Sequence, residues 1–297
     1  MLKDLRCALR MLRKQPGFTL VAVLTLALGL GASSTIFTYF DAVYLRGLPV
    51  SRPDELIYVA TGQKGGAYQA VSFLDYLDYR QQNDVFSDLA VYGTRGGLVG
   101  IEGEAQGVPV QLVSGNYFPL LGMQALLGRT LLPEDDSPSA AEPAVFISHN
   151  LWQQRFAGRA DAVGKVIRVN FADFTVVGVA PPHFRGINRF LDIALWVPVN
   201  QRPLMVRGSR KELDARESRW IDEMVGRLRP GVSLEQAQGQ LATIAGRLAG
   251  AYPKTNAGWS VAVSSEAARR RRAPFSRWQG PPWGSSCPWG SPSCCPC

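Results

Sequence analysis

The sequence has few of the residues that build catalytic and metal centres. It contains two histidines, His149 and His183, and none of its five cysteines lies between residues 41 and 263. A histidine-rich metal site is therefore excluded, and within 41–263 so is a cysteine–histidine nucleophile pair. His149 precedes a predicted helix and His183 follows a Pro-Pro turn, so a structural role is favoured for both. We expect no enzyme activity and no cofactor.

Charge is absent from residues 18–40, which read FTLVAVLTLALGLGASSTIFTYF. A helix rises about 1.5 Å per residue, so this run is long enough to cross a hydrocarbon core of about 30 Å. A buried helix of a soluble protein rarely runs this long without a polar face. A cleaved signal peptide is the closer alternative, but its apolar region is shorter, roughly 7–15 residues. We therefore predict one transmembrane helix over 18–40.

Basic residues are concentrated at the two ends of the chain. The formal net charge is +8; residues 1–17 and 264–297 each carry +4, and the rest sum to zero. A neutral body argues against a nucleic-acid partner. The positive-inside rule places the N-terminus in the cytoplasm and the residues after about 41 on the periplasmic or extracytoplasmic side of the plasma (inner) membrane.

Residues 1–17 combine leucines and basic residues at helical spacing. We expect an amphipathic helix in the cytoplasmic interface of the lipid bilayer, with its basic side chains near anionic headgroups. The predicted interface residues are Lys3, Arg6, Arg10, Arg13 and Lys14.

Small residues recur within the predicted span. Gly29 and Ser33 stand four apart, as do Ala27 and Gly31. Small residues at this spacing let a second helix approach closely. The spacing predicts helix packing against other transmembrane helices or a second permease copy, whereas chance in a Gly- and Ala-rich helix is the plainer explanation.

Two glycine-containing stretches resemble nucleotide-binding motifs but fail on spacing. Gly29-Leu30-Gly31 begins like a dinucleotide fingerprint, yet no strand precedes it and Ser34 stands where the last glycine belongs. A phosphate loop needs four residues between its glycines and a Ser or Thr after the lysine. The stretch from Gly158 to Lys165 has five, and Val166 follows. No ATP site is predicted.

Residues 41–263 alternate between strand-like and helix-like stretches without strict βαβ order, which predicts an α+β domain in two lobes. Ser72 and Ser233 each begin a capping box, so helices are expected after both, the first running toward Leu89 and the second ending at Pro253. The predicted strands are 56–60, 108–113, 144–148 and a hairpin of 166–169 with 174–179.

Two clusters of acidic residues were considered as sites. Glu134-Asp135-Asp136 could hold a cation, but its flanking prolines favour a solvated loop. The pairs Asp75-Tyr76 and Asp78-Tyr79 are interpreted as the surface and core faces of one helix. Neither cluster is predicted to be catalytic.

Several segments together resemble the MacB-like, FtsX-superfamily ABC transporter permeases, in particular the orphan permease group that lacks an adjacent ATPase gene. The resemblance covers residues 1 to about 263. It implies a MacB-like periplasmic core domain over 41–263, without enzyme activity, that serves export or mechanotransmission beside a separate cytoplasmic ATPase subunit. The segments are LKDLRCALRMLRKQPGF (2–18), VSGNYFPLLGMQALLGRTL (113–131), ISHNLWQQRFAG (147–158), FTVVGVAPPHFRG (174–186) and RLRPGVSLEQAQGQLATIAGRLAGAYP (227–253).

Residues 264–297 depart from this family, whose members continue into further transmembrane helices. The tail is rich in Arg, Pro, Gly and Ser and holds four of the five cysteines. This composition is typical of GC-rich DNA read out of frame, so we predict a frameshifted or truncated product with a disordered tail. A cysteine-rich metal or disulfide tail is the alternative, but the tail has no histidine and no two separated CxxC pairs.

Three functions follow from these observations. The first is the N-terminal part of an export permease, which needs other helices to enclose a path. The second is a single-pass, membrane-anchored extracytoplasmic binding or adaptor module. The third, a membrane-anchored enzyme, is disfavoured because no catalytic set is found.

Overall fold

The computed structural model describes residues 16–40, 50–101, 103–137, 142–187, 191–265 and 268. It divides into two compact units, as a two-lobed domain does. Lobe 1 is formed by the described residues of Met1–Pro53 and Thr94–Arg207, and lobe 2 by those of Asp54–Gly93 and Gly208–Cys297. Residues 94–207 therefore interrupt lobe 2 in the sequence.

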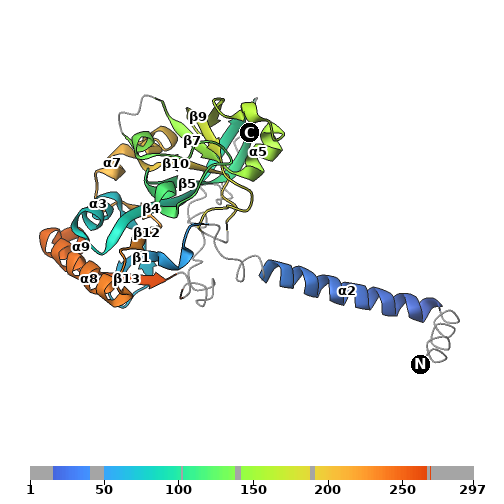
Figure 1. Cartoon of the computed structure of the whole chain (residues 1–297), viewed down its shortest axis with the longest axis horizontal. Coiled ribbons are helices and arrows are strands. Elements are labelled where there is room, and N and C mark those ends of the chain that lie inside the picture. Colours follow the sequence, from blue (N-terminus) through green and yellow to red (C-terminus); the bar gives the residue numbers. More distant parts are fainter. Residues whose placement is uncertain are drawn as a thin grey trace, which may run out of the picture. The chain divides into compact units, whose positions relative to one another are not determined.

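Lobe 2 contains antiparallel strands in the order β13–β1–β12–β4, with β4 continuing along the chain into lobe 1. The long helix α8 packs against β13 (Figure 1) and buries one face, formed by Ala237, Leu241, Ile244 and Leu248. Its elements are β1 (Leu56–Gln63), β2 (Tyr68–Gln69), β3 (Val71–Ser72), α3 (Phe73–Gln82), β4 (Phe86–Ile101), α7 (Arg210–Leu213), β11 (Arg219–Ile221), β12 (Glu223–Leu228), α8 (Leu234–Ala251), α9 (Pro253–Asn256) and β13 (Trp259–Ser265).

Lobe 1 has a mixed sheet in the order β4–β5–β10–β7–β9–β6, with β8 beside β4 and β9. The pairs β5–β10 and β7–β9 are parallel, and β7–β10 is antiparallel. The two lobes together confirm a mixed α+β fold. Its further elements are β5 (Glu104–Val113), α4 (Tyr117–Leu121), β6 (Leu127–Gly128), β7 (Ala144–Ile147), α5 (His149–Phe156), β8 (Val166–Val169), β9 (Ala172–Val179), β10 (Leu195–Pro198) and α6 (Arg202–Met205).

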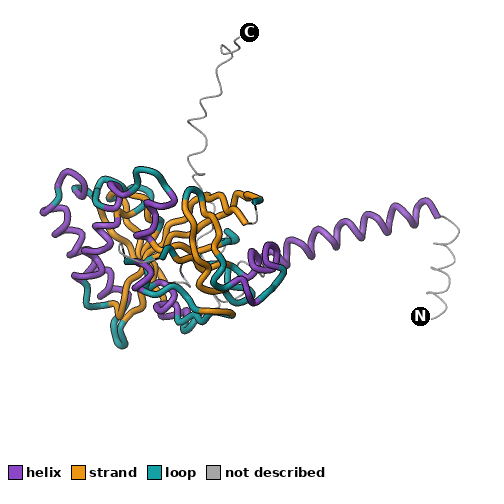
Figure 2. The backbone as a smooth tube through the Cα atoms, turned by 90° about the horizontal axis from the view of Figure 1, so that it is seen from above, coloured by secondary structure: helices purple, strands orange, loops and turns teal. Residues whose placement is uncertain are grey.

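Helix α2 spans Pro16–Phe40 and is drawn as one continuous helix (Figures 1 and 2). This confirms a helix over the predicted 18–40. Its described leucines and valines are all more than half exposed, and its side chains are described only in parts of 17–34. Among the residues that the structure describes, none of the helices combines the length and the hydropathy of a membrane span. The transmembrane assignment stays a prediction, and the basic residues of 1–15 lie outside the described part.

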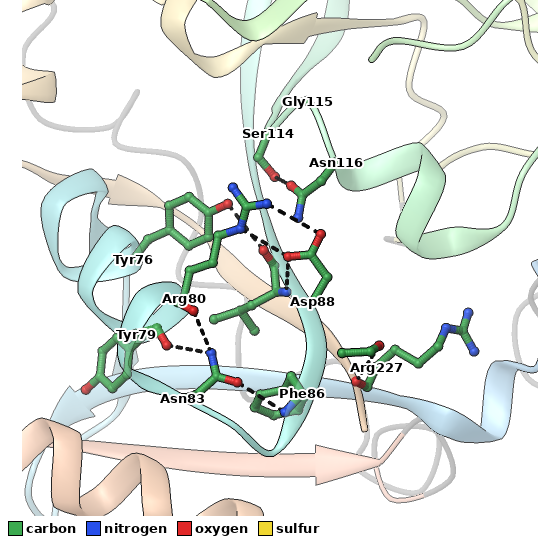
Figure 3. Close-up of polar contacts among 12 residues, drawn as sticks. Tyr76, Tyr79, Arg80, Asn83, Phe86, Asp88, Ser114, Gly115, Asn116 and Arg227 are labelled. Carbon is green, nitrogen blue, oxygen red and sulfur yellow. Dashed lines mark hydrogen bonds and ion pairs between the residues drawn. The ribbon is translucent and has the colours of Figure 1, made fainter. Parts of the chain in front are cut away.

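The predicted strands are present, but the helix that begins after Ser72 is shorter than predicted. It ends at Gln82 instead of running toward Leu89, and β4 begins at Phe86. Asn83 causes the early end. Its Nδ2 donates to the carbonyls of Tyr79 and Arg80 at 2.7 and 3.0 Å, and its Oδ1 accepts from the amide of Phe86 at 3.1 Å (Figure 3). An Asn side chain that satisfies these groups offers the backbone an alternative to helix.

Candidate functional site

The densest group of buried charges in lobe 2 surrounds Asp75, in the first turn of α3. Its Oδ1 accepts from Arg216 Nη1 at 2.7 Å and Asn256 Nδ2 at 2.9 Å, and its Oδ2 pairs with Arg219 Nη1 at 2.9 Å. The Asp75 side chain is 2% exposed. A charge this deeply buried is tolerated only when it is paired and hydrogen-bonded. Asp75 therefore ties α3 to β11 and α9.

Aromatic rings cover both arginines of this cluster. The Arg216 guanidinium lies 3.7 Å from the Tyr252 ring centroid, and that of Arg219 lies 3.5 Å from Trp259. Burial, followed by the nearby charge of Asp75, raises the pKa of Tyr79, so its phenol stays neutral. Both Asp75 oxygens are occupied by donors, so the carboxylate is not placed to act as a base. The cluster is a structural tie.

The interpretation of Asp75-Tyr76 and Asp78-Tyr79 as surface and core faces is correct for the tyrosines and wrong for Asp75. Tyr76 and Tyr79 are buried as expected, but so is Asp75. Asp78 pairs with Arg216 Nη2 at 2.6 Å. The sequence does not reveal the burial of Asp75 because its partner Arg216 lies 141 residues away along the chain.

The end of α3 is held to β4 by one exposed ion pair and one buried hydrogen bond. Arg80 Nε donates to Asp88 Oδ1 at 3.0 Å, and the Tyr76 hydroxyl donates to the Leu89 carbonyl at 3.2 Å (Figure 3). The Arg80 and Asp88 side chains are 43% and 36% exposed. Exposed pairs of this kind contribute roughly 0–1 kcal/mol. The Arg80–Asp88 pair therefore adds little stability.

The acidic run 134–136 in lobe 1 is not a free loop. It belongs to a short 3₁₀ helix, and its carboxylates accept hydrogen bonds from backbone amides. Asp136 accepts the amides of Gly115 and Asn200 at 3.0 and 2.9 Å. Asp135 accepts Arg129 Nη1 at 2.6 Å and the Leu132 amide at 2.9 Å. These contacts engage the oxygens that a cation needs. Across the described residues no group of three or more His, Cys, Asp or Glu could hold a metal ion.

Acid is expected to weaken lobe 1 through Asp135. Burial alone raises its pKa, but the Arg129 hydrogen bond, the Leu132 amide and the Arg129 charge together lower it below the ordinary value. A carboxyl with a depressed pKa contributes stability that is present above the unfolded-state value of about 3.9 and is lost as the pH falls through the folded value. Urea unfolding of the full chain in detergent should show this loss below about pH 4. D135N should flatten that part of the profile, whereas the same slope in both chains would contradict the assignment.

The core of lobe 1 is built on Trp196 and the buried Gln111. Trp196 Nε1 and the Tyr117 hydroxyl both donate to Gln111 Oε1, at 2.9 and 3.3 Å. The Trp196 ring lies 5.3–5.8 Å from three phenylalanine rings, those of Phe118, Phe146 and Phe184. Satisfied polar atoms inside an aromatic cluster specify one packing arrangement. This arrangement is architecture, not a ligand site.

Both histidines lie in lobe 1. His149 is the first residue of α5, and its ring packs edge-on against Trp152 at 5.4 Å between centroids. His183 has a positive φ of 74°. A structural role for both stays the interpretation.

The predicted packing residues all lie on α2. A Cβ built on Gly29 or Gly31 meets no atom within 4 Å. Packing through Ala27, Gly29, Gly31 and Ser33 stays a prediction.

The strands that sequence reasoning missed include β10, β12 and β13. Strand β13, with the residues WSVAVSS, follows a predicted helix stop. It pairs antiparallel with β1 from Ile57 opposite Ser265 to Gln63 opposite Trp259. The chain therefore begins β1 and ends β13 at the same end of one ladder. The alternation of Val261 and Val263 was a usable signal for a strand.

A sequence profile described as the MacB-like periplasmic core domain matches residues 19–244. The chain belongs to this family. The family's domain is periplasmic, so the chain is a membrane protein with an extracytoplasmic domain. The resemblance seen in the sequence is confirmed.

Curated relatives agree with this MacB-like assignment. The macrolide export ATP-binding/permease proteins MacB of Salmonella paratyphi A and Shigella dysenteriae serotype 1 are each 28% identical, over 131 and 129 residues. The match covers 43% of this chain and 18% of each relative, so the chain spans less than a fifth of their length.

Two solved structures share the fold. The periplasmic region of MacB from Actinobacillus actinomycetemcomitans has a TM-score of 0.53 at 14% identity, covering 77% of this chain and 95% of that one. A domain of a putative permease protein from Porphyromonas gingivalis has a TM-score of 0.53 at 18% identity, covering 74% and 92%.

Proposed function

We propose that the chain is the N-terminal part of an ABC-type export or mechanotransmission permease. Residues 18–40 form its first transmembrane helix, and the two lobes stand outside the membrane. Family membership supports the permease class, and the relatives named macrolide export ATP-binding/permease proteins support export. A separate cytoplasmic ATPase subunit is the proposed source of ATP hydrolysis, as the resemblance to the orphan permease group implies.

The pairing of β1 with β13 carries this proposal. Ile57 lies opposite Ser265, so the start of β1 and the end of β13 lie side by side at one end of lobe 2. A domain placed between two membrane helices needs this arrangement, because both connections return to the same surface. A domain on a single anchor has no such requirement. The proposed partners are the lipid bilayer and further transmembrane helices or a second permease copy.

Thiol labelling tests the orientation. Cys7 lies in the predicted cytoplasmic segment, and 41–263 has no cysteine. In a variant whose four tail cysteines are serine, a membrane-impermeant maleimide should spare Cys7 in intact spheroplasts and label it after permeabilisation. A cysteine replacing the exposed Thr243 of α8 should be labelled in intact spheroplasts. Labelling of Cys7 without permeabilisation, or protection of position 243, would refute the orientation.

The gene decides between the permease and a single-pass adaptor. Translation of the DNA downstream of codon 263 in all three frames should reveal several apolar runs of about 20 residues, each long enough for a membrane helix. No such run in any frame would remove the permease proposal and favour the adaptor module.

A further inference from the structure

Strand β13 is the outer strand of the lobe 2 sheet. Among the described strands it pairs with β1 alone and stands first in the strand order. Its seven residues WSVAVSS contain no charge and no proline. An outer strand of this composition is a template for pairing with another chain, and proteins commonly protect such strands with lysine, proline or a covering element. In β13 the first two devices are absent from the sequence.

The side chain of Gln238, on α8, covers this edge. Its Nε2 donates to the Val261 carbonyl at 2.9 Å, and its Oε1 accepts from the Val263 amide at 3.0 Å. Residues two apart on a strand present their backbone groups to the same side. The Gln238 amide, which has a donor and an acceptor, thus occupies the Val261 carbonyl and the Val263 amide, two backbone groups that an added strand would hydrogen-bond.

Neighbouring contacts hold Gln238 in place. The next glutamine along α8, Gln240, accepts from the amides of Asp84 and Val85 at 3.1 and 3.3 Å. The start of α8 is fixed by a capping box, in which Ser233 and Gln236 bond each other's backbone amides at 3.2 and 2.8 Å. The helix turn that presents Gln238 is therefore anchored on both sides in the sequence.

We infer that Gln238 guards the β13 edge against pairing with β13 of a second copy of this chain. Two identical outer strands can pair antiparallel about a two-fold axis, which gives a closed, self-complementary dimer. An uncharged strand meets no like-charge repulsion in that pairing. The alternating Val261 and Val263 supply the β-branched side chains that cross-strand contacts favour. The inference does not depend on the proposed permease function.

Replacement of Gln238 by alanine tests whether its side chain prevents strand pairing. All variants are full chains purified in the same detergent. We expect Q238A to have twice the protein mass of the wild type by light scattering, with the Val263 amide still protected from hydrogen exchange because a new strand covers it. The control is T243A. Thr243 is an exposed residue of the same helix, and among the described contacts its hydroxyl donates only to the Gly239 carbonyl of that helix. T243A should keep the wild-type mass. Any association through α2 is the same in all of these chains, so it does not contribute to the difference in mass.

A second variant separates edge pairing from other causes of association. Q238A/S264K adds a lysine to the strand and should restore the wild-type mass, because a charge on an edge opposes pairing. Circular dichroism and limited proteolysis identify a variant that has lost its fold. A folded Q238A with wild-type mass would overturn the inference, whether or not Val263 exchanges. So would a doubled mass that persists in Q238A/S264K or appears in T243A. If Q238A does not fold, Q238N is measured instead. The shorter asparagine side chain cannot reach both the Val261 carbonyl and the Val263 amide, so a folded Q238N with the wild-type mass would overturn the inference.

Discussion

Replacing Asp75 with alanine is expected to destabilise lobe 2 by about 3–5 kcal/mol, the range seen when one partner of a buried ion pair is removed. The substitution leaves Arg216 and Arg219 buried beside each other without their shared carboxylate, since their side chains are only 14% and 12% exposed. It also removes the acceptor of Asn256 Nδ2. Urea unfolding of the full chain in detergent, followed by tryptophan fluorescence, measures the change.

The matched control for D75A is D173A. Asp173 also pairs with an arginine, Arg168, at 3.2 Å, but both side chains are 60% exposed. Exposed pairs contribute roughly 0–1 kcal/mol, so D173A should change the unfolding free energy by no more than that. If D75A costs no more than D173A, the buried cluster is not the tie that its geometry indicates.

Replacing Trp196 with alanine should cost lobe 1 about 3–5 kcal/mol, the usual range for large aromatic residues in a core. The loss has two sources. A cavity opens among three phenylalanines, since the Trp196 side chain is fully buried, and Gln111 Oε1 loses its shorter hydrogen bond. Urea unfolding followed by circular dichroism measures the effect without relying on the deleted fluorophore.

Two variants divide the Trp196 effect. W196F keeps a ring in the core but removes the Nε1 donor, so it should cost about 1–3 kcal/mol, less than W196A. F171A removes an aromatic ring that is 55% exposed and should change stability by less than about 0.5 kcal/mol. Equal losses for W196A and F171A would show that the aromatic core does not determine the stability of lobe 1.

Local chemistry explains which elements the sequence predicts well. The Ser233 capping box and the spacing of Leu241, Ile244 and Leu248 predict α8 because all the residues involved lie within a few turns. The hairpin of β8 and β9 is predicted for the same reason, although β9 begins at Ala172, two residues earlier than expected. Asn170 shortens the turn by adopting a positive φ of 53°.

The missed features depend on residues far apart in sequence. The amide of Leu98 donates to Asn170, and Gln201 accepts from Ala144; neither pair is close in sequence. Asp75 could be placed in a helix but not in the core, because its burial depends on Arg216 and Arg219. No period or motif records such pairings. The sequence therefore predicts the class and family of the domain better than its buried polar contacts.

The insertion of 94–207 into lobe 2 has a consequence for the order of folding. Lobe 1 is nearly contiguous, so its strands can pair while the chain is still being made. Strand β1 emerges early but pairs with β12, where Leu56 lies opposite Arg227, and with β13. Such long-range pairings form late and leave apolar strands exposed in the meantime. Strand β1 can pair early with β2 over two residues, but its long pairings must wait until almost the whole domain has been synthesised, so most of its apolar residues stay exposed until then.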